Sequence, residues 1–235
     1  MDVEKVIAGR AFVDGELRYT EIGICDGSIV TMGSMVRGGD ERIELGTSQI
    51  MLPGFIDPHV HFRDPGMTSK ETFGTGTLSA AYGGVTCVLD MPNTKPPVTD
   101  LQSLMDKKSS VRGRANVDYG LFAAVTANIN AASIAPLVPG FKLFMGSTTG
   151  NILLDDDEEM IPAVRNALST GKRLSVHAED DHLIKKAPEG CTRDHLRNRP
   201  AEAELNAIRR LADSFGGSRV NICHITTPEG LDLAR

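Results

Sequence analysis

Short apolar segments alternate with amphipathic stretches through most of this chain, starting near residue 51. Nearly continuous apolar runs of strand length are typical of strands covered on both faces, as in a parallel sheet. We predict strands near residues 54–59, 85–91, 117–123, 141–145, 173–178 and 220–224. Helices are predicted near residues 69–82, 100–108, 133–137, 156–169, 201–215 and 228–235. Repeated βα units of this kind predict a parallel sheet, either doubly wound or closed into a barrel.

The first fifty residues follow a different pattern. Residues 6–13 and 21–32 are apolar or alternating, as expected for strands. Asp14-Gly15 follows the first segment and Asp26-Gly27 interrupts the second, and such pairs are typical of tight turns between antiparallel strands. We therefore expect a small, sandwich-like β module over residues 1–50 and a barrel domain over residues 51–235.

Polar residues at the strand ends distinguish a barrel from a doubly wound sheet. Those on or just past different predicted strands are His59, His61, Asn93, Lys142, His177 and His224. Chemistry gathered from many strand ends is typical of the (β/α)8 TIM-type barrel, whereas a doubly wound sheet usually binds its ligand at one switch point. No Gly-x-Gly-x-x-Gly turn follows the first of these strands. The pattern favours an α/β fold of the barrel type.

The number of units indicates an incomplete barrel. A complete one takes about 250 residues and eight βα units. Only six units are predicted here, and the 235-residue chain ends inside a predicted helix. We therefore expect a barrel that stops before its last strands.

Composition is typical of a soluble globular protein, since 40% of the residues are hydrophobic and 24% are charged. The formal net charge is −6, without a block of basic residues. The densest basic stretch consists of Lys95, Lys107, Lys108, Arg112 and Arg114. We interpret it as a solvated helix face, not as a surface that binds nucleic acid.

The cysteines and the N-terminus indicate the compartment. Cys25, Cys87, Cys191 and Cys223 are far apart and form no Cys-x-x-Cys pair. This spacing favours reduced thiols in a cytoplasmic protein over a disulfide scaffold or a zinc ribbon. We expect neither a signal peptide nor a membrane span, because the start is charged and no apolar run approaches roughly 18 residues.

His59 and His61 form a His-x-His pair at the end of a predicted strand. Because side chains at i and i+2 of a strand point the same way, both imidazoles can face one metal ion. Asp57 lies on the same side as a candidate partner that would orient a ligand. Two satisfied core histidines are the alternative, but the position directly after Pro-Gly-Phe-Ile-Asp favours a metal site.

His177 and His224 each close another buried strand, and each alone is more often structural. Four imidazoles at the same end of one barrel are difficult to explain by packing. Zinc suits this ligand set best, with manganese or cobalt as alternatives. His182 and His195 fall in polar helical or loop contexts, and we interpret both as surface residues.

Lys142 lies within the apolar segment Phe141–Met145, where a charged amine is costly to bury. One interpretation is that the side chain extends to the strand end and keeps its ammonium in water. The other is that burial lowers the pKa of the amine, which can then take up carbon dioxide as a carbamate that bridges two cations. The residues themselves leave both open.

Two motifs resemble those of dihydroorotases, within the amidohydrolase superfamily. The first is Pro53-Gly54-Phe55-Ile56-Asp57-Pro58-His59-Val60-His61-Phe62-Arg63-Asp64-Pro65-Gly66, and the second is Met91-Pro92-Asn93-Thr94-Lys95-Pro96-Pro97. The resemblance runs from about Val6 to the last residue. The strands of Lys142, His177 and His224 fall where the family has its remaining metal ligands.

The resemblance implies a site and a reaction. His59 and His61 would bind one Zn²⁺, His177 and His224 a second, and N6-carboxylated Lys142 would bridge them. Arg63 and Asn93 would bind the substrate carboxylate, a task that suits a guanidinium. The implied reaction is the reversible hydrolysis of the cyclic amide of (S)-dihydroorotate to N-carbamoyl-L-aspartate, in de novo pyrimidine (UMP) biosynthesis.

The sequence departs from the family at the catalytic carboxylate. The family takes its general-base Asp from the end of the last barrel strand, just before Ala-Pro-His. No such segment occurs here, and Asp180, Asp181 and Asp194 do not match its position. We hypothesise that this chain lacks the general base and the C-terminal part, so that its turnover falls well below that of a full-length relative.

Other functions are compatible with parts of the pattern. An allantoinase or a dihydropyrimidinase is the nearest alternative, but those substrates lack the ring carboxylate that Arg63 would hold. A non-catalytic dihydroorotase-like partner of aspartate carbamoyltransferase is another, although such chains are expected to lose metal-binding histidines. The resemblance is also compatible with a homodimer.

Overall fold

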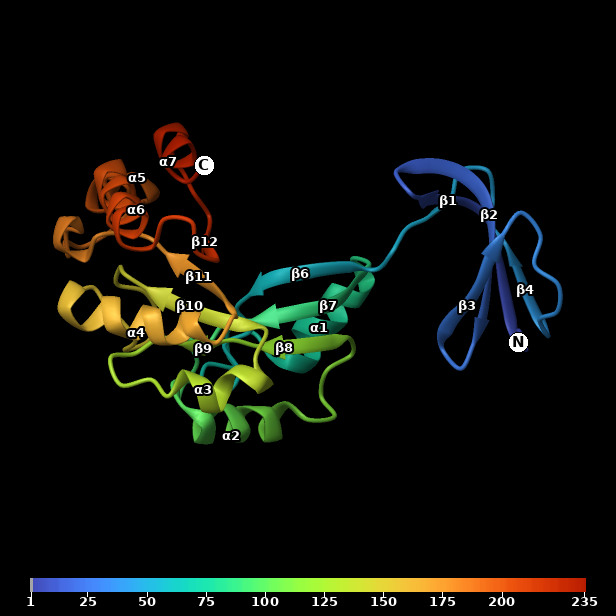
Figure 1. Ribbon diagram of the computed structural model, residues 1–235, viewed down its shortest axis with the longest axis horizontal. Coiled ribbons are helices and arrows are strands. Elements are labelled where there is room, and N and C mark those ends of the chain that lie inside the picture. Colours follow the sequence, from blue (N-terminus) through green and yellow to red (C-terminus); the bar gives the residue numbers. More distant parts are fainter. Residues whose placement is uncertain (1) are drawn as a thin grey trace. The chain divides into compact units, whose positions relative to one another are not determined.

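The computed structural model describes residues 2–235 (Figure 1). The chain divides into two compact units, one that ends at Gly54 and one that runs from Phe55 to Arg235. Within the described residues, no helix is long and apolar enough to cross a membrane.

The first unit is a five-stranded sheet. Its strands are β1 (Lys5–Val13), β2 (Glu16–Cys25), β3 (Ser28–Gly33), β4 (Glu41–Glu44) and β5 (Ile50–Met51). β2 pairs antiparallel with β1 and with β3, while β4 and β5 run parallel to β1. Asp14 and Asp26 have φ angles of 53° and 49°, each followed by a glycine with positive φ, as two-residue hairpin turns require. The predicted segment 21–32 is therefore parts of two strands, and the short β4 and β5 were not predicted.

A buried carboxylate, that of Glu21, links three segments of the first unit. Glu21 on β2 accepts a hydrogen bond of 2.7 Å from the backbone N–H of Val36 and one of 2.6 Å from Arg42 on β4. The hydrogen bonds from Arg42 and Val36 lower the pKa of Glu21 from 4.5 to about 2. The ionised carboxylate thus ties three segments of this unit.

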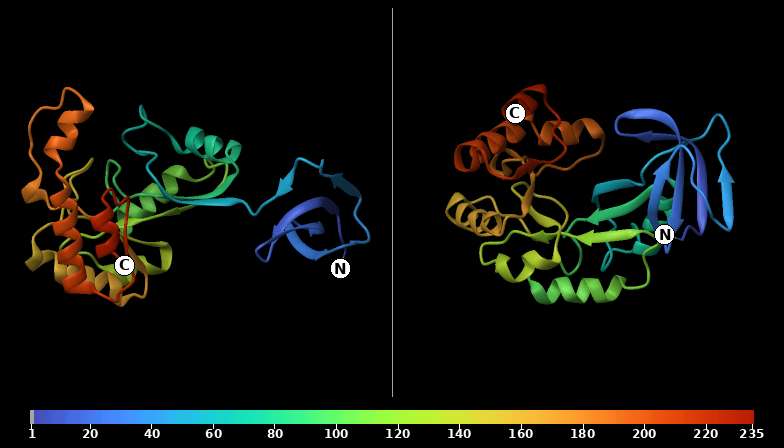
Figure 2. Two further views of the ribbon diagram at one scale, coloured as in Figure 1. Left: turned by 90° about the horizontal axis from the view of Figure 1, so that it is seen from above. Right: turned by 45° about the vertical axis from the view of Figure 1, so that its right-hand side comes forward.

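The second unit is built from parallel strands. They are β6 (Phe55–Val60), β7 (Val85–Asp90), β8 (Asp118–Leu121), β9 (Ala123–Ala124), β10 (Gly140–Phe144), β11 (Arg173–His177) and β12 (Val220–Ile222). Their order is β6-β7-β8 in one sheet and β9-β10-β11-β12 in the next (Figures 1 and 2). Only Phe122 separates β8 from β9, so these two strands together form the third of the six predicted strand positions.

Strand order identifies the architecture. Neighbours within both sheets of the second unit follow the chain order, whereas a doubly wound sheet reverses its order at a switch point. Sequential parallel strands that alternate with helices are the arrangement of a TIM-type barrel. The predicted α/β fold, a partial barrel of about six βα units, is confirmed.

Helices follow the strands in the order α1 (Phe73–Tyr82), α2 (Leu101–Val111), α3 (Ala131–Ile134), α4 (Asp157–Ser169), α5 (Thr192–Asn198), α6 (Ala201–Phe215) and α7 (Pro228–Leu233). α1 begins later than residue 69 because Thr72 and Thr75 form a reciprocal capping box. The predicted helix at 133–137 is α3 followed by a 3-10 turn that contains Pro136. α5 was missed because it is short and polar, without an apolar stripe.

The core of the second unit lies around β10, whose five residues are all buried. α1 packs on β7 and α4 packs on β11. Gly76 of α1 lies against Phe62, and a Cβ at this position would collide with the Phe62 ring. The close approach allows Phe62, which follows His61, to pack edge-on against Phe73.

The interpretation of the basic stretch as a solvated face was wrong for Lys107. This side chain is 2% exposed, and its amine donates a 2.5 Å hydrogen bond to Asp90, which is fully buried. Asp90 also accepts a hydrogen bond of 2.9 Å from the backbone N–H of Phe62. The single sequence does not reveal this pair because its members lie 17 residues apart, on β7 and α2.

Glu21 should make the stability of the first unit depend on pH. The pKa of its carboxylate is lower in the folded state than in the unfolded chain, so its contribution is complete above about pH 4.5 and is lost as the pH falls toward 2. We expect the E21Q variant to be less stable than wild type at pH 7, with a difference that shrinks below about pH 4.5. Urea unfolding of both proteins over this range measures it, with E16Q as an exposed control. A difference independent of pH would contradict the assignment.

Removal of the Lys107 cation should be strongly destabilising. The K107M variant leaves the Asp90 carboxylate buried and unpaired, which costs about 3–5 kcal/mol. The double variant D90N/K107M carries no unpaired charge and should recover much of this loss. Urea unfolding followed by circular dichroism tests the prediction, and equal destabilisation of the single and double variants would show that the pair is not the cause.

Candidate metal centre

Four imidazoles from three strand ends meet in the second unit. His59 lies on β6 and His61 directly follows it, while His177 ends β11 and His224 follows β12. Ring centroids lie 5.1 Å apart for His59 and His61, 5.5 Å for His59 and His224, and 4.9 Å for His177 and His224. Parallel strands place their carboxyl ends at one edge, which is why residues 165 positions apart in the sequence become neighbours.

The first pair consists of His59 and His61. Their Nε2 atoms lie 3.2 Å apart, so the side chains do point to the same side, as the i, i+2 spacing predicts. Burial lowers the pKa of His59 to about 3 and that of His61 to about 4, with a further contribution from the nearby Lys142 charge. Both rings are therefore neutral near pH 7. Asp57 accepts a hydrogen bond from the backbone N–H of His59. It therefore fixes the backbone at this position and does not orient the imidazole ring.

Asn93 orients the ring of His61. Its Oδ1 lies 2.8 Å from His61 Nδ1, and an amide oxygen can only accept, so Nδ1 carries the proton. The Nε2 lone pair of His61 is then directed toward His59. The Nδ2 group of Asn93 is buried and has no hydrogen-bond partner in the described structure, so one strong donor is available to a ligand.

The second pair consists of His177 and His224, with 3.2 Å between His177 Nδ1 and His224 Nε2. His177 Nε2 lies 2.6 Å from Glu179 Oε2, which also accepts a hydrogen bond from Arg199. Burial raises the pKa of Glu179, but the contacts with His177 and Arg199 outweigh it and the net pKa is lowered. The carboxylate therefore holds the proton of His177 on Nε2 and leaves Nδ1 free, the arrangement common for metal-binding histidines.

Lys142 is fully buried on β10, which excludes the interpretation that its ammonium reaches water at the strand end. Burial lowers the pKa of its amine. The amine donates a hydrogen bond of 3.1 Å to the Cys223 thiol and lies 5.3 Å from the centroid of the Phe144 ring. It forms no ion pair among the described residues.

Arg63 lies beside Asn93 at the ends of β6 and β7. Its Nη1 donates a 3.2 Å hydrogen bond to the backbone carbonyl of Asn93, and burial lowers its pKa. Arg63 and His224 have φ angles of 63° and 40°, a conformation that is uncommon for residues other than glycine. Such backbone strain is concentrated at functional sites.

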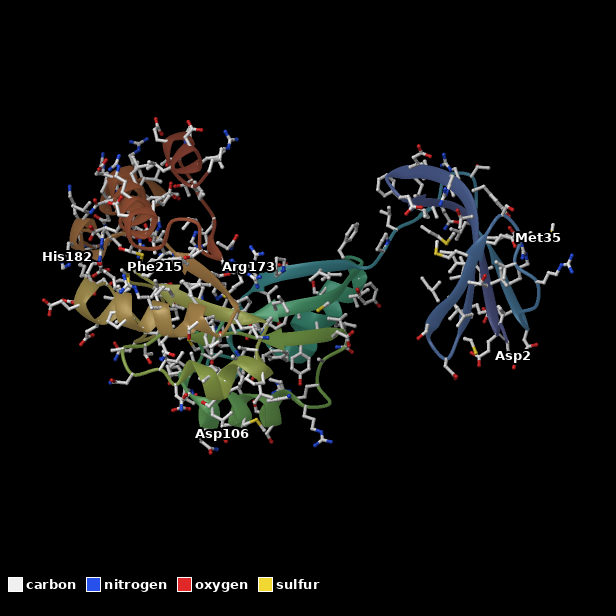
Figure 3. The ribbon with its side chains drawn as sticks, in the orientation of Figure 1. Asp2, Met35, Asp106, Arg173, His182 and Phe215 are labelled. Atoms are coloured by element: carbon white, nitrogen blue, oxygen red, sulfur yellow. The ribbon has the colours of Figure 1, made fainter. Side chains whose placement is uncertain are left out.

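A cavity of about 590 Å³ opens beside the second pair and is lined by His177, Glu179, His195, Arg199 and His224, among others. Glu204 of α6 accepts four hydrogen bonds from the backbone and hydroxyl groups of Thr226 and Thr227, which also line it. His195 was predicted to be a surface residue and is half exposed. His182 was predicted likewise, and its side chain is 78% exposed. Figure 3 labels it at the outer edge of the second unit.

The donor set fits divalent metal ions. Two Zn–N bonds of about 2.0–2.1 Å at a tetrahedral angle place their nitrogens about 3.3 Å apart. Both histidine pairs have separations of 3.2 Å, and hydrogen bonds fix one proton position in each pair. Among residues 2–235, no three His, Cys, Asp or Glu side chains gather as one ligand group. The histidines instead form two pairs, with Lys142 nearby.

Comparisons with known proteins concern the sequence and the fold of this chain as a whole. A dihydroorotase of Pyrococcus abyssi is 37% identical over 97% of this chain and 52% of its own length, and an allantoinase of Rubrobacter xylanophilus is 34% identical over similar shares. The chain thus spans about half the length of these curated relatives. The fold resembles an L-hydantoinase (dihydropyrimidinase) from Arthrobacter aurescens, with a TM-score of 0.86, 24% identity and coverage of 98% of this chain and 55% of that one. The profile of the Dihydro-orotase-like family matches residues 48–230, and the chain belongs to this family.

Proposed function

We propose that this chain carries the metal-binding and carboxylate-binding residues of a dihydroorotase, which acts on the cyclic amide of dihydroorotate. The observation that supports this most directly is the presence of two histidine pairs. Asn93 orients one ring of the first pair, and Glu179 orients one ring of the second. The relatives named dihydroorotase support the substrate. The absence of disulfide bonds among the four free cysteines supports a cytoplasmic location.

The proposal assigns two zinc ions. His59 and His61 would hold one, and His177 and His224 the other. When bound, the metals would supply Lewis acidity that activates water at neutral pH and polarises the ring carbonyl. Asn93 and Glu179 hold the imidazoles in the tautomers that such binding requires.

Lys142 would bridge the two metals as a carbamate. A buried amine without a carboxylate partner is destabilised as an ammonium and reacts as the neutral base. Its addition to carbon dioxide converts a cation into an anion, which two nearby divalent ions stabilise. The amine contacts Cys223, the residue before His224, and lies 5.3 Å from the centroid of the Phe144 ring, which is 6.2 Å from that of His177.

Arg63 and Asn93 would bind the ring carboxylate of the substrate. Arg63 uses one N–H on the carbonyl of Asn93 and keeps further donors for a bidentate contact. The buried Nδ2 of Asn93 supplies another donor in the same place. A carboxylate of the ligand would satisfy both, and neither allantoin nor dihydrouracil carries one at this position of the ring.

Proton transfer to the leaving nitrogen needs a carboxylate general acid or base. The segment Asp-x-Ala-Pro-His, which holds this group in the family, does not occur in the sequence. The proposal therefore assigns to this chain the binding of metals and substrate, and no residue of it to the proton transfer.

Zinc binding tests the metal assignment. We expect the purified chain, supplied with zinc and bicarbonate, to hold two zinc ions, and we expect N93L to weaken one of them about 10–100-fold because His61 loses its orienting acceptor. Zinc titration with mass spectrometry of the intact protein measures both. H182N replaces an exposed histidine and should bind as wild type does. An N93L variant with unchanged affinity would contradict the assignment.

Ligand preference tests the substrate. The zinc-loaded chain should bind dihydroorotate more tightly than dihydrouracil, which lacks the carboxylate. R63M should remove this preference, because a hydrogen bond to a charged group contributes about 1.5–3 kcal/mol, or about 10–150-fold in affinity. R112M replaces an exposed arginine and serves as the control. Calorimetry measures each affinity, and tighter binding of allantoin would favour an allantoinase instead.

A further inference from the structure

A buried amine and a buried thiol are in direct contact beside the histidine pairs. Lys142 is fully buried and Cys223 is 5% exposed. The 3.1 Å hydrogen bond from Lys142 Nζ to Cys223 Sγ is the one contact of this amine in the hydrogen-bond network of residues 2–235. The metal site proposed above uses the amine and has no role for the thiol.

The fold creates this contact between strands that are not adjacent. Lys142 on β10 is in register with Ser175 on β11, and Ser175 is in register with Asn221 on β12. Cys223 lies two residues beyond Asn221, and its backbone N–H donates to the carbonyl of Val176. The backbone therefore holds the sulfur in place, and the approach does not depend on an exposed, mobile loop.

Cys223 is buried but borders a cavity. It lines a cavity of about 510 Å³ together with His59, Ser175 and His224. All four cysteines are free, and a second thiol does not accompany Cys223 in this cavity. Lys142 Nζ, at 3.1 Å, lies within hydrogen-bond distance of the sulfur.

We propose that Lys142 and Cys223 form a reversible oxidative cross-link, a sulfenamide, when a hydroperoxide enters this cavity. The Sγ atom first attacks one peroxide oxygen, the O–O bond breaks, and the thiol proton leaves with the departing hydroxide as water. Sulfur is oxidised by two electrons to the sulfenic acid, and the peroxide is reduced. The Lys142 nitrogen then attacks the sulfur, the S–O bond breaks, and the hydroxide leaves with one amine proton as a second water.

The cross-link would compete with the carbamate for one nitrogen. This consequence rests on the proposed function, because it matters only if Lys142 bridges the metals. A nitrogen bonded to sulfur cannot supply the bridging carbamate, so oxidation would block metal assembly. A thiol reductant cleaves the S–N bond and returns both side chains.

Peptide mapping by mass spectrometry tests the cross-link in the metal-free chain treated with hydrogen peroxide. We expect peptides that contain Lys142 and Cys223 to appear joined, lighter by two hydrogen atoms, and to separate again with dithiothreitol. The folded chain should yield roughly tenfold or more cross-link than the chain in urea, because only the fold holds the two atoms in contact. Oxidation of the exposed Cys191 in the same sample shows that the peroxide is active.

Matched variants separate the outcomes. C191S should cross-link as wild type does, and C223S should not. K142R should leave a sulfenic acid on Cys223 that dimedone captures. A folded wild-type chain with oxidised Cys191 but no bond between Lys142 and Cys223 would overturn the inference.

Zinc distinguishes this inference from the proposed function. If Lys142 bridges the metals as a carbamate, prior loading with zinc and bicarbonate should suppress the cross-link. Equal cross-linking with and without zinc would support the amine–thiol reaction and count against the metal-bridging role of Lys142. Two bound zinc ions, without any cross-link in the metal-free chain, would support the metal-bridging role and overturn the amine–thiol reaction.

Discussion

The arrangement of the second unit depends on one buried carboxylate, Asp90, at the end of β7. It accepts hydrogen bonds from the backbone of Phe62 and from the Lys107 amine, which also donates to the carbonyl of Met91. Phe62 follows the His-x-His pair and Met91 leads to Asn93, so both motifs take their positions from this group. A carboxylate buried without a cation costs several kcal/mol. The site therefore depends on Lys107, which is buried and does not belong to the surface.

Oxygen acceptors next to the histidines orient two of the four rings, and this orientation is what makes the cluster a candidate metal centre. Asn93 and Glu179 each fix the proton on one imidazole nitrogen and leave the other nitrogen free. Four imidazoles and a buried amine would be an unfavourable way to fill a core, because their polar atoms need partners. Metal ions would satisfy the free nitrogens of both pairs at once.

Membership of the family indicates the general class of protein but does not identify one substrate. Relatives named dihydroorotase and allantoinase are 37% and 34% identical to this chain, so sequence identity alone does not separate these two substrates. Arg63 and Asn93 are the positions at which a ring carboxylate would be recognised, and the structure holds them together through the hydrogen bond from Arg63 to the Asn93 carbonyl. Lys142 and Cys223 form a buried pair of reactive groups, of which the proposed metal site would use only the lysine.

The sequence by itself determined the order of strands and helices, because apolar periodicity and glycine turns are local signals that each segment carries alone. It also predicted the clustering of His59, His61, His177 and His224, because parallel strands bring their carboxyl ends to one edge. Tertiary structure decided the partners of these residues. That Asp90 lies against Lys107, Glu179 against Arg199 and Lys142 against Cys223 follows from register and packing between distant segments, and the burial of a lysine depends on what surrounds it in space.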